Sequence, residues 1–109
     1  MGLFRRKKAP SDAETRAEFV RVSRLICDSV EQHVDGSNES ERRLLEKATQ
    51  LRALTNSNAA WQAIVAVLLV VCEDALQSLD FSTDGERQLY VDAMGIVGQF
   101  ADAGFYDKL

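Results

Sequence analysis

The run from Ala59 to Cys72, AAWQAIVAVLLVVC, has Gln62 as its only strongly polar side chain. A helix that is apolar on every side must be covered on every side, either by other segments of the chain or by a second chain. At about 1.5 Å per residue the run reaches roughly 21 Å, short of the roughly 30 Å hydrocarbon layer of a bilayer. Glu73 and Asp74 end it at once. The run therefore predicts a buried core helix rather than a transmembrane helix.

Capping patterns at the boundaries of the apolar segments predict four helices. Ser11 and Glu14 have the spacing of a capping box, in which each side chain bonds the backbone amide of the other residue, and Thr83 and Glu86 repeat it. No strand pattern of comparable strength competes with these helices. We expect helices over about residues 11–35, 38–54, 58–79 and 83–103.

Length and composition fit one domain. A chain of 109 residues can bury a core without disulfides, and its 46% apolar and 28% charged content is ordinary for globular proteins. We predict an all-α, four-helix bundle-like single domain over residues 11–109, with a central, nearly all-apolar third helix. Residues 1–10 are expected to form a flexible basic tail. Cys27 and Cys72 lie in apolar helical surroundings, which predicts reduced thiols, and no secretory signal is visible, which predicts a cytoplasmic protein.

The last two predicted helices carry more apolar surface than the first two can cover. The third is apolar all round in its first half, and apolar residues span roughly 220° of the fourth, whereas the first two helices have one stripe each. We therefore expect a homodimer or a protein partner, with a complete monomer as the alternative. For Trp61 a core position is the other interpretation. The expected contact residues are Trp61, Leu68, Val91, Met94, Val97 and Ala101.

Gly95 and Gly98 lie three residues apart in the fourth predicted helix. Glycine costs about 1 kcal/mol relative to alanine inside a helix. The pair is therefore typical either of close backbone approach by a neighbouring element or of tolerated surface positions.

Charge is divided unequally between the two halves of the chain. Residues 1–52 carry 11 basic and 9 acidic side chains, whereas residues 53–109 carry 2 basic and 8 acidic ones. Either the two halves pair electrostatically, or an acidic outer face recruits a basic partner. The first alternative directs Arg21, Arg24, Arg42 and Arg43 toward Glu73, Asp74 and Asp92.

The first eight residues, MGLFRRKK, combine apolar side chains with four cations. Such a segment can attach weakly to an anionic membrane surface, and a solvated tail is the alternative. Myristoylation at Gly2 is disfavoured, because Arg6 stands where the acceptor pattern has Ser or Thr. The residues expected to contact a membrane or another anionic surface are Leu3, Phe4, Arg5, Arg6, Lys7 and Lys8.

The sequence predicts neither catalysis nor a metal site. His33 is six residues from Cys27, about 240° away around a helix, so the two cannot form an adjacent pair. Residues 80–85 match the first half of a calcium loop, but its twelfth position is Val91 instead of the closing Glu. Residues 9–109 carry 9 basic and 17 acidic side chains, which argues against binding nucleic acid.

These exclusions leave a protein that acts through its surface. We expect a non-enzymatic protein–protein interaction module without a cofactor, such as a small adaptor, chaperone-like, inhibitory or regulatory protein. It would act by helix-on-helix docking. The alternative is a peripheral membrane protein tethered by its basic start.

Overall fold

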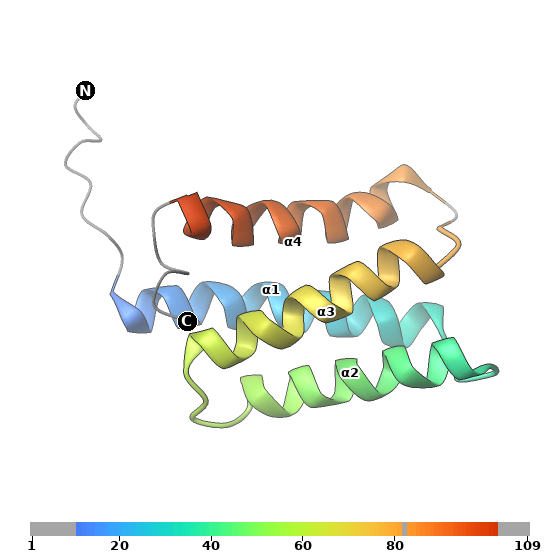
Figure 1. The fold of residues 1–109 in the computed structure, drawn as a ribbon, viewed down its shortest axis with the longest axis horizontal. Coiled ribbons are helices and arrows are strands. Elements are labelled where there is room, and N and C mark those ends of the chain that lie inside the picture. The colour runs from blue at the N-terminus through green and yellow to red at the C-terminus, as the bar shows by residue number, and fades with distance from the viewer. Residues whose placement is uncertain (1–10, 82, 103–109) are drawn as a thin grey trace.

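The computed structural model describes residues 11–81 and 83–102, with side chains described as far as Gln99, and these residues form four helices. The helices are α1 (Asp12–His33), α2 (Glu39–Thr55), α3 (Trp61–Ser78) and α4 (Asp84–Asp102). Figure 1 shows α1 lying behind α3, with α2 and α4 on either side. The contacts confirm this order: α1, α2 and α3 pack closely on one another, while α4 packs mainly on α3 and less on α1. The predicted all-α bundle is confirmed.

The N-termini of α1 and α2 begin at the expected caps. The amide of Glu14 donates to Ser11 Oγ at 3.1 Å, and the amide of Ser11 donates to Glu14 Oε1 at 2.9 Å, which completes the capping box. Asn38 Oδ1 accepts from the amide of Glu41 at 2.9 Å. Gly36, in the turn between these helices, has a φ of 80°, a left-handed conformation that favours glycine.

The third helix starts later than expected, at Trp61 rather than near Asn58. Its N-cap is Ala60, whose side chain makes no capping bond. The polar turn before it is used differently: the Ser57 hydroxyl donates to the carbonyl of Leu54 at 3.0 Å and accepts from the amide of Ala59 at 3.1 Å. The turn therefore closes the end of α2 instead of capping α3.

The core lies between α3 and the three other helices. α3 contributes seven buried residues, the stripes of α1 and α2 face it, and Tyr90, Ala93 and Val97 bring α4 into the same cluster. The completely buried large side chains include Phe19, Ile26, Leu44, Leu51, Ile64, Leu68 and Tyr90. α3 is thus central to the bundle.

The outer face of α3 is nevertheless exposed. Ala63 and Ala66 are exposed, and Val70 is 38% exposed. The expectation that this helix is covered on every side therefore holds only in part, because small side chains on its outer face leave little apolar area for a neighbour to cover. Among the described helices, α3 is the one long and apolar enough to cross a bilayer, with a mean hydropathy of 1.4 over 18 residues. Buried core helices share that property.

Candidate partner-binding surface

Three of the predicted contact residues lie in the core. Trp61, Leu68 and Val97 are 4%, 0% and 6% exposed, and the Trp61 ring stacks on Phe19 with 6.0 Å between centroids. Their side chains are withdrawn from the molecular surface, which removes them from the expected contact surface of the folded chain. The apolar periodicity that singled them out is the same for a core residue and for an interface residue.

The remaining predicted contact residues are divided between the bundle and the undescribed parts of the chain. Val91 and Met94 are half-buried on α4, and Met94 packs against the core. The side chain of Ala101 lies outside the described residues. So do the membrane-contact candidates Leu3, Phe4, Arg5, Arg6, Lys7 and Lys8.

The outer face of α1 carries a surface that the sequence did not single out. α1 turns Phe19, Ile26 and Val30 into the core. The opposite face exposes Leu25 at 45%, and Leu25 and Val70 are the two exposed large apolar side chains in the part of the chain that the structure describes.

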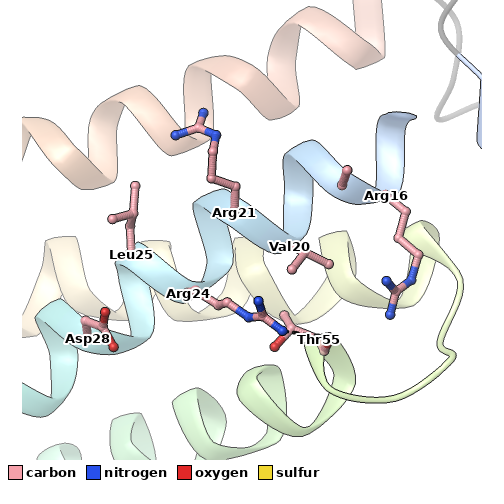
Figure 2. Close-up of a pocket in the computed structure, with 8 residues that line it drawn as sticks. Arg16, Val20, Arg21, Arg24, Leu25, Asp28 and Thr55 are labelled. Atoms are coloured by element: carbon pink, nitrogen blue, oxygen red, sulfur yellow. Dashed lines mark hydrogen bonds between the residues drawn. The ribbon is translucent and has the colours of Figure 1, made fainter. Parts of the chain in front are cut away.

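Around Leu25 the surface is hollowed into an open groove of about 630 Å³ (Figure 2). Three apolar side chains, three guanidinium groups and one carboxylate line it together with a threonine. These residues are Arg16, Ala17, Val20, Arg21, Arg24, Leu25, Asp28 and Thr55. The lining therefore combines apolar side chains with charged ones, and most of the charged ones are cations.

Arg16 holds the loop between α2 and α3 against α1. Its Nε donates to the carbonyl of Ala59 at 2.7 Å, and its Nη2 donates to the carbonyls of Ser57 and Leu54. The C-terminal carbonyls of a helix lack intrahelical donors and carry partial negative charge, so a cation is favoured there. Leu54 lies in the last turn of α2, whereas Ser57 and Ala59 belong to the loop that follows, so Arg16 ties α1 to both.

Arg24 also caps the end of α2. Its Nη2 donates to Asn56 Oδ1 at 3.1 Å and to the carbonyl of Thr55 at 3.5 Å, and Figure 2 shows the side chain extending to Thr55. These acceptors are neutral, so they position the guanidinium without cancelling its charge. Arg21 instead forms an exposed pair with Glu18 of its own helix, at 2.8 Å.

Arg52 of α2 bridges two carboxylates of α1, one of which lines the groove. It lies 2.8 Å from Asp28 and 3.0 Å from Glu31, both on α1. Hydrogen bonding to Asp28 and then to Glu31 raises the pKa of Arg52 above its usual range. The negative charge of Asp28 is therefore compensated in part, because one guanidinium is shared between two carboxylates.

The hollow continues along α1 toward the start of α4. A second depression of about 550 Å³ shares Leu25 and Asp28 with the groove and reaches His33 of α1 and Leu89 of α4. Tyr90 Oη donates to Ser29 Oγ at 2.7 Å, which ties α4 to α1 beside it. α4 thus borders the exposed face of α1 on one side, and the end of α2 borders it on the other.

His33 makes a second link between α1 and α4. Its Nδ1 lies 2.8 Å from the carbonyl of Ser29 and its Nε2 lies 3.2 Å from Glu86 Oε1. Both neighbours are acceptors, so the doubly protonated ring satisfies both. The Ser29 carbonyl chiefly, and then Glu86, raise the pKa of His33, against the opposing effect of burial.

The other reactive side chains are buried. Cys27 and Cys72 are free thiols; the Cys27 thiol donates to the carbonyl of Ala48 at 3.2 Å. Burial raises the pKa of Cys27 to about 11 and that of Cys72 to about 12, so both are protonated at neutral pH. Among residues 11–81 and 83–102, no group of three histidine, cysteine or acidic side chains is placed to hold a metal ion.

The expected pairing of basic and acidic halves is replaced by local pairs. Arg21 pairs with Glu18, and Arg42 and Arg43 pair with Glu39, in each case within one helix. Among the described residues, the pairs between helices come from Arg52, which joins α2 to α1, and from His33 and Glu86, which join α1 to α4. The sequence pattern did not indicate either pair. No family model, curated protein or solved structure matches the chain. The proposed function therefore starts from the groove on α1.

Proposed function

We propose that this protein is a non-enzymatic interaction module, of the adaptor or regulatory kind, that docks a helix of its partner along the outer face of α1. One observation carries the proposal: Leu25, 45% exposed, lies in a groove at whose rim Arg24 is held by the end of α2. A single exposed leucine is ordinary. A leucine in a hollow helix face, with polar groups beside it, is an arrangement that suits the docking of a helix.

The dimensions of the face suit a helix. From Arg16 to His33, α1 rises by roughly 26 Å at about 1.5 Å per residue, which matches four to five turns of a partner. α3 packs on one side of α1, with α2 and α4 beside both (Figure 1). A partner helix would take the corresponding place on the opposite side of α1.

A photo-crosslinking amino acid in place of Leu25 tests the proposal. The control carries the same group in place of Gln50, which is exposed on α2 away from the groove. We expect a discrete crosslinked species in cells from position 25 and none from position 50. Absence of a product at position 25, or the same products from both positions, would contradict the docking of a partner at this face.

A homodimer would use a different surface, the outer face of α3. The exposed stripe of Ala63, Ala66 and Val70 on α3 supports it, since small side chains let two helices approach closely. Light scattering would give twice the 12.1 kDa chain mass for the dimer. Val70→Lys would return the mass to that of the monomer, whereas a single-chain mass for the unaltered protein would exclude this form.

Attachment to membranes is the second candidate function, and the charge distribution supports it. Residues 11–109 carry 9 basic and 17 acidic side chains, so they would be repelled by an anionic bilayer, whereas the start of the chain carries four cations. We expect co-sedimentation with phosphatidylserine vesicles that is lost on deletion of residues 1–8. Binding that survives the deletion, or no binding of the full chain, would exclude a basic tether.

A further inference from the structure

The groove on α1 is a positive region on an acidic protein. Of the 9 basic side chains in residues 11–109, Arg16, Arg21 and Arg24 line the groove and Arg52 borders it. α3 and α4 together carry one basic residue, Arg87. The cations are therefore concentrated where Leu25 is exposed.

We infer that the partner segment that docks on this face is an acidic amphipathic helix. Its apolar side chains would cover Ala17, Val20 and Leu25, and its carboxylates would meet Arg21 and Arg24. This inference rests on the proposed function and names the chemistry of the partner. It follows from charge complementarity. Arg16 and Arg24 bond neutral oxygens and keep their charge, Arg21 is paired with Glu18, and the one lining carboxylate, Asp28, is bridged to Arg52.

The two rim arginines have donors to offer a carboxylate. A guanidinium carries five N–H donors, and the bonds of Arg24 to Thr55 and Asn56 come from one terminal nitrogen. Arg24 is thereby positioned before a partner arrives, which lowers the entropy lost on binding. Arg21 is 59% exposed and paired with Glu18, an interaction between exposed side chains that a partner can replace at little cost.

The floor of the groove favours a peptide over a nucleic acid. Ala17, Val20 and Leu25 would be covered by leucine-like side chains, whereas a phosphate backbone would leave them exposed beside its charges. A basic or neutral helix would leave the guanidiniums desolvated without partners, which costs affinity. A partner helix that carries both apolar side chains and carboxylates would match the apolar residues and the guanidiniums of the lining.

Fluorescent helical peptides added to the full-length protein test the inference. One peptide has leucines along one face and flanking glutamates; two others carry glutamine or lysine in place of the glutamates. We expect the acidic peptide to bind about tenfold more tightly than the glutamine peptide, the lysine peptide not to bind, and the difference to shrink as salt rises. Anisotropy measures the binding.

Arg21→Glu and Arg43→Glu form a matched pair of variants. Both arginines are exposed, at 59% and 64%, and each pairs with a glutamate of its own helix, but only Arg21 lines the groove. We expect Arg21→Glu to weaken the acidic peptide about tenfold and Arg43→Glu to leave it unchanged. Circular dichroism verifies that both variants keep their helices.

Several results would overturn the inference. These are no binding of the acidic peptide at millimolar concentration, equal binding of the acidic and glutamine peptides, equal losses in the two variants, or tighter Arg21-dependent binding of a single-stranded oligonucleotide. The proposed function is judged separately by the crosslink at Leu25. A crosslinked partner whose docking segment is neutral or basic would overturn the acidic chemistry and leave the docking module standing.

Discussion

The outer faces of α1 and α3 are both exposed, but they differ in what surrounds the exposed apolar side chain. On α3, Val70 stands beside Ala63 and Ala66. On α1, Leu25 lies in a groove with Arg21 and Arg24 at its rim. The first is an apolar stripe, while the second combines apolar side chains with hydrogen-bond donors, which together would give a docked helix both affinity and orientation.

In this bundle the most apolar helix is not the one with the hollowed, exposed face. The most apolar helix, α3, buries its largest side chains in the core and exposes mostly small ones. The more polar helix, α1, has its own core stripe and still holds an exposed leucine in a hollow. The stability of variants on both faces tests this difference.

The largest expected effect is the difference in unfolding free energy between substitutions on the inner and the outer face of α3. Leu68→Ala should lower the free energy of unfolding by about 3 kcal/mol, because Leu68 is fully buried and its loss leaves a cavity. Val70→Ala should cost less than about 0.5 kcal/mol, as at other exposed positions. Urea denaturation measures both. A concentration-dependent loss of more than about 1 kcal/mol at Val70 would show that a second chain covers this face.

A smaller effect is expected at the border of the α1 groove. Arg52→Ala should destabilise the fold by about 1 kcal/mol, because Arg52 bridges two carboxylates on another helix. Arg42→Ala, which removes a pair within α2, should change stability by less than about 0.5 kcal/mol. Thermal unfolding compares the variants; equal losses would mean that the bridge between helices adds nothing.

The glycines of α4 test whether anything covers its outer face. Nothing lies within 4 Å of a Cβ built at Gly95 or Gly98, so Gly95→Ala and Gly98→Ala should each stabilise the chain by about 0.5–1 kcal/mol. Gly36→Ala should have the opposite sign, because its φ of 80° disfavours a side chain. Loss of stability or of self-association in the α4 variants would instead indicate a close neighbour there.

The smallest expected effect is the pH dependence of the link between α1 and α4. The pKa of His33 is raised in the folded chain above its ordinary value of 6.5, first by the Ser29 carbonyl. Its stabilising contribution is therefore full below pH 6.5 and is lost as pH rises through the raised pKa. The difference in unfolding free energy between the unaltered protein and His33→Gln, measured from pH 5 to 8, should shrink toward high pH and stay below about 1 kcal/mol. A difference that grows with pH would contradict this assignment.

Local sequence patterns were sufficient to predict the helices but not to predict which of their faces are buried. The capping residues Ser11 and Asn38 and the turn at Gly36 act over a few residues, so their roles follow from spacing. Trp61 and Leu68 were placed at an interface because periodicity cannot tell which covered side belongs to the same chain. Leu25 was missed because it lies outside the apolar stripe of α1, and one apolar residue off the stripe carries no periodic pattern.

The sequence alone therefore determined the all-α class, the central place of the apolar third helix and the acidic body behind a basic start, because these depend on composition and local spacing. Only the tertiary structure decided which faces remain open, and where the arginines of α1 are held. Arg16 and Arg24 meet acceptors that lie about 30 to 40 residues away along the chain, a separation at which no local pattern operates. Arg16 and Arg24 are held in place because packing brings those distant acceptors to α1.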